Sequence, residues 1–152
     1  MIEQIRLPFP GKSLPDQDED ILLTSLIFLR ARDDIPQARV GVGCVARNRV
    51  NNVSSWWGQG YRKVITNLLD FYRISEQEKN LVMNPIKNNV NDKWDECYLI
   101  ATKIIDNTIP DNTYNSDYFF LTSDKKFNPS LISSWYVCTH GNIRFYRIEL
   151  VE

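Results

Sequence analysis

The pattern of apolar and polar positions predicts a fully buried helix near the N-terminus. Apolar residues between positions 21 and 29 cover almost every face of a helix, and a helix that is apolar all round is buried. Asp16 and Glu19 have the spacing of a capping box, which predicts that this helix runs over about residues 17–32.

A second helix is expected over about residues 35–52. Asp34 is a good N-cap, Pro36 fits the first helical turn, and Gln37 completes a capping box with Asp34. The small residues between positions 40 and 44 give this helix a narrow surface that allows close packing.

Three further helices follow. One is expected over about residues 61–70, and Ser75 with Glu78 caps a short helix over about 76–83. The clearest amphipathic helix, over about 92–106, has apolar residues at helical spacing. These residues are Trp94, Cys97, Tyr98, Ile100, Ala101, Ile104 and Ile105. Trp94 and Tyr98 are expected to lie in the core.

The last third of the chain changes to strand patterns. Residues 117–121, 134–139 and 143–150 favour strands, and His140-Gly141-Asn142 is expected to be the hairpin turn between the last two. Helices followed by a small sheet indicate an α+β fold, mainly helical, with a short C-terminal antiparallel sheet. We expect an extended, proline-rich arm over residues 1–17 and one domain over residues 18–152.

Composition and charge exclude several classes of function. The 152 residues carry 18 basic and 19 acidic side chains without a basic block, so nucleic-acid binding is not expected. No apolar run has the length of a membrane span, and Met1–Pro8 lacks the apolar core of a signal peptide. Cys44, Cys97 and Cys138 are interpreted as free buried thiols, and with His140 as the only histidine we expect neither a metal site nor a cofactor.

Several motifs, taken in order, resemble those of the SleB-type cell wall hydrolases over about residues 21–147. Arg30–Asp34 stands where the family has Glu-Ala-Arg-Gly-Glu, and the second helix closes with Asn-Arg-Val at 48–50. Residues 94–101 resemble the family's Trp-x-x-Cys-x-x-Ile-Ala helix, and residues 108–111 its Leu-Pro-Asp turn. Gly141–Tyr146 resembles the closing Gly-Asn-His-x-Phe-Tyr. The resemblance implies a small lysozyme-like fold that cleaves the glycan strand of peptidoglycan in the manner of a lytic transglycosylase.

The chain departs from the family at the catalytic position. The first glutamate of the family's run is its catalytic acid, and Arg30 stands in that place. Cleavage of a glycosidic bond needs a proton donor, and a guanidinium, with a pKa above about 12, does not give up its proton. Asp33 and Asp34 are the candidates for a displaced acid, although Asp34 is also the expected N-cap and Asp33 also reads as a solvated loop carboxylate. Arg30 itself either complements the helix dipole or binds a ligand carboxylate or a partner protein.

Aromatic and polar residues supply candidates for glycan binding. Trp56, Trp57 and Tyr61 either stack on sugar rings or fill the core. Asn142 and Tyr146, in the closing motif, are the other candidates, and Tyr146 also reads as sheet packing. Ile143 stands where the family has its histidine, which removes a polar group from the expected cleft.

Two functional hypotheses follow. In the first, the domain has lost its acid and serves as a non-catalytic structural or adaptor component of a phage virion, within a larger assembly. In the second, it is an active peptidoglycan hydrolase or lytic transglycosylase with a displaced carboxylate. The expected partners are therefore the glycan strand or other virion proteins, and the expected location is the host cytoplasm during assembly, or the virion.

Overall fold

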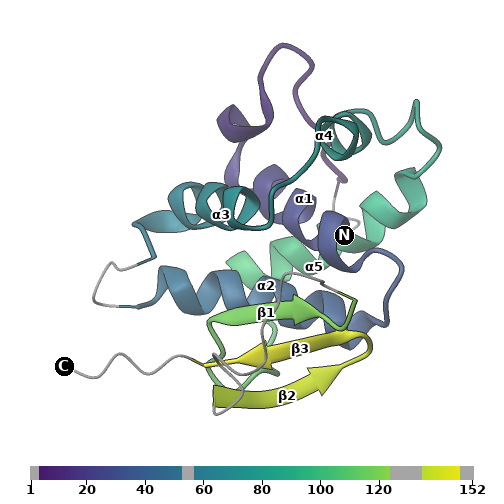
Figure 1. Cartoon of the computed structure of the whole chain (residues 1–152). Helices are drawn as coiled ribbons and strands as arrows, with labels where there is room; N and C mark the ends of the chain where they lie inside the picture. Colours follow the sequence, from purple (N-terminus) through teal and green to yellow (C-terminus); the bar gives the residue numbers. More distant parts are fainter. Residues whose placement is uncertain (1–3, 53–56, 124–134, 148–152) are drawn as a thin grey trace.

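The structure is a computed structural model that describes residues 4–52, 57–123 and 135–147 (Figure 1). It confirms the α+β class: five α-helices come first and a three-stranded antiparallel sheet comes last within these ranges. The helices are α1 (Glu19–Ala31), α2 (Pro36–Val50), α3 (Gly60–Phe71), α4 (Glu76–Met83) and α5 (Asn91–Ile105). The strands are β1 (Tyr118–Leu121), β2 (Tyr136–His140) and β3 (Ile143–Tyr146), and a short 3₁₀ helix, η1 (Leu14–Asp16), precedes α1.

The core forms around α1, which the other helices surround (Figure 1). Every residue of α1 from Ile21 to Leu29 is buried, as the all-round apolar pattern predicted. Trp94 and Tyr98 of α5 are buried against it, and the Trp94 ring lies 6.2 Å from the ring of Phe28. No helix in the described part of the chain combines the length and apolar character that a membrane span needs.

The N-terminal segment is tied to this core by polar contacts. Arg6 forms ion pairs with Asp18 (2.6 Å) and Asp20 (2.8 Å), and its carbonyl accepts a hydrogen bond from Trp94 Nε1. The buried amide of Gln17 hydrogen-bonds both the N–H and the carbonyl of Phe9. The segment therefore follows the surface of the helical core as an ordered strap from residue 4 onward.

The capping box predicted for α1 at Asp16 and Glu19 was wrong. Asp16 lies inside η1, where its carboxylate accepts a hydrogen bond from the Ser13 hydroxyl at 2.9 Å. The N-cap of α1 is Asp18, and its side chain does not cap the helix because it pairs with Arg6. At the start of α1, the Asp18 carboxylate therefore forms an ion pair with Arg6 in place of a capping hydrogen bond.

The predicted capping of α2 was also wrong, whereas that of α4 is confirmed. Ile35 occupies the N-cap position of α2 with no side-chain cap, so Asp34 and Gln37 form no capping box. In α4, Ser75 Oγ accepts the Glu78 N–H at 3.1 Å, and Glu78 Oε1 accepts the Ser75 N–H at 3.3 Å. Asp34 does not cap α2 because its carboxylate accepts a hydrogen bond from the N–H of Asn142, in the turn between β2 and β3.

The sheet has the order β1-β3-β2, with β3 in the centre. The last two strands form the predicted hairpin, but His140 belongs to β2 and Gly141, at φ 57°, makes the turn with Asn142. Phe119 of β1 faces Phe145 of β3 across the sheet and both rings are fully buried, so this face covers the helical core. The predicted strand over 143–150 ends at Tyr146, and residues 148–150 lie outside the described ranges.

The small residues of α2 set how closely its neighbours approach. A Cβ atom on Gly41 would lie 2.3 Å from the ring carbon Cζ of Phe145 in β3. A Cβ atom on Gly43 would lie 3.0 Å from Ile104 Cγ1 in α5. The predicted narrow surface is confirmed, since α2 contacts the sheet and α5 through its glycines.

We expect Gly41→Ala to lower the free energy of unfolding by about 1–2 kcal/mol. Overpacking a core costs about 1–3 kcal/mol, and the better helix propensity of alanine offsets up to about 1 kcal/mol of that. Urea unfolding measures the change. Gly11→Ala is the control, because nothing lies within 4 Å of a Cβ atom there. An equal effect of the two substitutions would contradict the close α2–sheet contact.

The interpretation of the cysteines as free is confirmed, with a difference in burial. Cys44 and Cys97 are buried and Cys138 is half-buried. Burial raises the pKa of Cys97 to about 12 and that of Cys44 to about 11. A raised pKa in the folded state means that burial disfavours the thiolate, so the fold is favoured while the thiol stays protonated.

This shift predicts a loss of stability in alkali. The stabilisation is fully present below the ordinary thiol pKa of 9.0 and is lost as pH rises towards about 12, the folded pKa of Cys97. Between about pH 8 and pH 10.5, Cys97 alone should cost the wild type about 1–2 kcal/mol. Urea unfolding of the wild type and Cys97→Ala across this range measures it. Parallel pH profiles for the two proteins would refute the assignment.

Candidate active site

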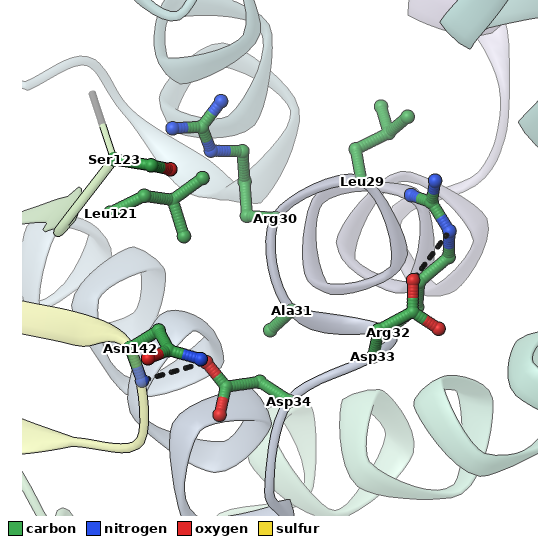
Figure 2. Close-up of a pocket in the computed structure, with 9 residues that line it drawn as sticks. All are labelled: Leu29, Arg30, Ala31, Arg32, Asp33, Asp34, Leu121, Ser123 and Asn142. Carbon is green, nitrogen blue, oxygen red and sulfur yellow. Dashed lines mark hydrogen bonds and ion pairs between the residues drawn. The ribbon is translucent and has the colours of Figure 1, made fainter. Parts of the chain in front are cut away.

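A cavity of about 310 Å³ lies where α1 ends. Residues 29–34, from the last turn of α1 and the turn to α2, form one side of it. Leu121 and Ser123, at the end of β1, and Asn142, in the β2–β3 turn, form the other side (Figure 2). The fold therefore brings together two of the motifs on which the resemblance rests, residues 30–34 and 141–146.

Arg30 is half-buried in the last turn of α1 and lines this cavity. Its guanidinium carbon lies 4.4 Å from the ring centroid of Tyr72, which follows α3. Figure 2 shows the guanidinium on the same side of α1 as Leu121 and Ser123, pointing away from the Asp34 carboxylate. A cation–π contact of this length holds the side chain against the ring.

Asp33 also lines the cavity, but its carboxylate is engaged with Arg32. The two side chains approach to 3.7 Å, and 78% of the Asp33 side chain is exposed. In Figure 2 this pair lies on the other side of the α1 end from Arg30. Arg32 is in turn held over the ring of Phe28, 4.9 Å from its centroid.

Asp34 links the α1–α2 turn to the sheet. Its Oδ1 accepts the backbone N–H of Ile35 at 2.8 Å, and its Oδ2 accepts the N–H of Asn142 at 2.9 Å. A Cβ atom on Gly141 would lie 1.9 Å from Asp34 Oδ1. Both this contact and the positive φ of the turn require glycine at position 141. Asp34 therefore acts as a clamp between the end of α1 and the hairpin.

Aromatic rings continue from the cavity along the outer side of β1. We call Phe71, Tyr72, Tyr118 and Phe120 the aromatic cluster. The ring of Phe71 meets those of Tyr72, Tyr118 and Phe120 edge-on at 5.0, 6.0 and 6.1 Å. Phe71 is 51% exposed, so the cluster reaches the surface. The exposed face of Phe71 suits stacking on an apolar face of a sugar ring.

The predicted stacking residues Trp57 and Tyr61 lie outside the cavity lining. Trp57 is only 7% exposed, and its ring packs between Tyr118, at 5.1 Å, and the Arg49 guanidinium, at 4.1 Å. Tyr61 is half-buried on α3, and burial raises its pKa to about 12. Trp56 is outside the described residues.

Of the other two glycan-binding candidates, only Asn142 lines the cavity. Tyr146 is 2% exposed and packs edge-on against Phe120 at 5.9 Å. Glycan binding by any of these residues stays a prediction. The structure gathers Arg30, Asp33, Asp34 and Asn142 in one place and sets Trp57, Tyr61 and Tyr146 apart from it.

Sequence reasoning missed Phe71 and Tyr72. The signal available in the sequence was a pair of adjacent aromatic residues at the end of an amphipathic helix. The structure shows that Phe71 is exposed there. The hydroxyl of Tyr72 donates to the Phe119 carbonyl and its ring stacks on that of Phe119 at 4.7 Å. Tyr72 thus fixes the end of α3 to β1 and supports Arg30 at the same time.

Nothing in the described ranges resembles a metal centre, since no three His, Cys, Asp or Glu side chains gather there as ligands would. A second cavity of about the same volume is lined by residues of the N-terminal segment, α1 and α5, and by Asp106. Its members are Gln4, Asp20, Tyr98, Thr102, Ile105 and Asp106. Size does not distinguish the two cavities, and the convergence of the motif residues favours the first.

The comparisons with known proteins identify the fold. No family model and no curated protein matches the chain. Among solved structures, the chain is similar to the catalytic domain of the germination-specific lytic transglycosylase SleB from Bacillus anthracis, with a TM-score of 0.63. The match covers 90% of this chain and 98% of that one, at 17% identity. The fold is that of the SleB catalytic domain. It extends over nearly the whole chain, as the resemblance of the motifs implied.

The Asp34 clamp leads to a testable prediction. Asp34→Ala removes both acceptors and should lower the free energy of unfolding by about 1–2 kcal/mol, because a hydrogen bond to a charged group contributes about 1.5–3 kcal/mol when well shielded and less at a half-exposed site. Urea unfolding gives the stability, and amide hydrogen exchange at Asn142 should become faster.

Asp33→Ala is the matched control, since it removes a neighbouring carboxylate from an exposed ion pair. Such pairs contribute about 0–1 kcal/mol, and the exchange of Asn142 should stay unchanged. If both substitutions had the same effect on the Asn142 amide, the clamp would not exist.

Proposed function

We propose that this domain binds the glycan strand of peptidoglycan at the cavity beside the aromatic cluster and does not cleave it. The observation that carries the proposal is the position of Arg30 in a fold shared with a lytic transglycosylase domain. The resemblance places the family's catalytic acid at residue 30, which lines the cavity between the end of α1 and the sheet. A guanidinium there can bind but cannot donate the proton that the leaving oxygen needs.

The environment of the two neighbouring carboxylates supports the same conclusion. A carboxylic acid donates a proton near neutral pH when apolar surroundings keep it protonated. Asp33 is open to solvent and lies beside the Arg32 guanidinium, and both oxygens of Asp34 accept backbone N–H groups. Neither carboxylate has apolar surroundings, and the clamp holds Asp34 away from Arg30 (Figure 2).

The alternative is an active hydrolase that uses Asp33 as a displaced acid. One observation favours it: Asp33 lines the cavity and its side chain is exposed, so it has room to turn towards a ligand. This candidate and the non-catalytic one differ in whether bound peptidoglycan is consumed.

Binding and turbidity assays with purified peptidoglycan sacculi distinguish the non-catalytic hypothesis from the active one. We expect the wild type to co-sediment with sacculi and to leave their turbidity unchanged. Arg30→Glu should clear the suspension slowly, because a general acid contributes about 10²–10⁴ in rate. Arg30→Gln is the control for removal of the arginine alone and should not clear it. Clearing by the wild type that Asp33→Asn abolishes would overturn the proposal in favour of the alternative.

A role within a phage virion is the biological setting that we propose for such a non-catalytic domain. A binding domain that leaves the wall intact suits attachment of a particle or of one of its parts to the cell surface. Mass spectrometry of purified virions from the source of this sequence tests this setting, and absence of the chain from the particles would exclude it.

A further inference from the structure

We infer that the outer face of the sheet extends the site, so that a glycan strand leaving the cavity past Phe71 crosses the three strands and meets a second aromatic contact at Tyr136. This rests on the proposed glycan binding. It adds the path of the glycan strand and the length of glycan that the full site needs.

Three tyrosines lie side by side across the strands. Tyr146 in the central strand β3 is the register partner of both Tyr118 in β1 and Tyr136 in β2. Register partners point to the same face of a sheet, and the next residues along, Phe119 and Phe145, point to the core on the other face. Tyr118, Tyr146 and Tyr136 therefore form a row on the outer face, which we call the tyrosine row.

Ring contacts join the tyrosine row to the aromatic cluster. Phe71 meets Tyr118 at 6.0 Å and Phe120 at 6.1 Å. Phe120 in turn meets Tyr146 at 5.9 Å, and Tyr146 meets Tyr136 at 5.8 Å. Rings in mutual contact therefore lead from Phe71, beside β1, across the sheet to Tyr136 in β2.

The two ends of this path are exposed, and its middle is polar. Phe71 is 51% exposed and Tyr136 is 49% exposed, whereas Tyr146 between them is 2% exposed. The exposed side chains next to Tyr146 on this face are those of Arg144 and Thr139, which are register partners.

This order of apolar and polar groups favours a glycan over a protein as the ligand. A protein interface has an apolar centre and a polar rim, and here the exposed rings lie at the ends. A glycan suits the order found, because each sugar has an apolar face that stacks on a ring and hydroxyl groups that form hydrogen bonds with polar side chains.

The two exposed rings are held in place by neighbouring side chains. Tyr136 packs edge-on against Tyr146, and its hydroxyl lies 2.6 Å from that of Thr139, at hydrogen-bond distance. Phe71 is held by three rings of the aromatic cluster. Binding therefore costs little side-chain entropy at either end, which favours affinity.

Glycan length tests the inference. The probes are the disaccharide and the hexasaccharide of alternating N-acetylglucosamine and N-acetylmuramic acid, titrated calorimetrically into the wild type and Tyr136→Ala. The disaccharide should bind both proteins equally, because it is too short to reach Tyr136 from Phe71. The hexasaccharide should bind Tyr136→Ala about 2- to 10-fold more weakly than the wild type, the range expected for one aromatic contact. The statistical advantage of a longer glycan is the same for both proteins and cancels.

Further variants assign the effect to the Tyr136 ring. Tyr136→Phe keeps the ring and should bind both probes as the wild type does, whereas Phe71→Ala should bind both probes more weakly. Tyr114→Ala is the matched control, because Tyr114 is a 74% exposed tyrosine in the turn before β1, outside the tyrosine row. In NMR spectra of the wild type, the hexasaccharide should shift the amides of Tyr136 and Thr139 and the disaccharide should not, a result that needs no variant to fold.

The outcomes separate this inference from the proposed function. If Tyr136→Ala binds the hexasaccharide as tightly as the wild type, the path across the sheet is wrong and glycan binding at the cavity stands. Binding of neither probe by the wild type overturns both. An equal loss in Tyr114→Ala excludes a specific role of Tyr136. Self-association of the wild type that Tyr136→Ala abolishes, without a change in hexasaccharide affinity, assigns the face to a second copy of the chain instead.

Discussion

The burial of α1 on all sides is the constraint on which the rest of the structure depends. Its apolar residues from Ile21 to Leu29 leave no face for solvent, so helices have to cover it all round, and its C-terminal turn lines the cavity. Whatever stands at residue 30 is thereby held at the junction of helix and sheet. A side chain on so rigid an element is positioned with little freedom, which is what a binding or catalytic group needs.

The site is then completed by contacts that come from distant parts of the chain. Asp34 joins the end of α1 to the β2–β3 turn, and Tyr72 joins the end of α3 to β1. Both contacts lie near Arg30 and fix the elements around it. The chemistry that we propose for the cavity therefore depends on a single side chain, since a guanidinium at position 30 cannot donate a proton as a carboxylic acid can.

Much of this fold could be predicted from the sequence, because its signals are local. All-round apolarity predicted the buried α1, and helical spacing predicted α5 with Trp94 and Tyr98 in the core. The Ser75–Glu78 capping box was also correct, because nothing distant competes for these exposed side chains. The predicted caps failed at the starts of α1 and α2, because residues distant in the sequence engage the carboxylates there. Arg6 pairs with Asp18, the true N-cap of α1, and the Asn142 N–H binds Asp34.

The site was predicted in part, for the same reason. The motif resemblance located residues 30–34 and the hairpin but could not give the directions of side chains. The reading of Asp33 as a solvated loop carboxylate agrees with its exposure, whereas Asp34, which was expected to cap α2, is a clamp to the hairpin. For Trp57 the sequence left sugar stacking and core packing open, and the structure packs its ring against Arg49 and Tyr118. The exposed ring is Phe71, which only the packing of α3 against β1 reveals.

The most direct test of the central claim is an NMR titration of the labelled protein with the N-acetylglucosamine–N-acetylmuramic acid tetrasaccharide. The account predicts shifts of the amides of Arg30, Asp33, Ser123 and Asn142, at the first cavity, with the sugar spectrum unchanged over days. Shifts confined to Tyr98 and Thr102, at the second cavity, would contradict the location of the site. Conversion of the tetrasaccharide to shorter products would contradict the claim that the domain binds without cleaving.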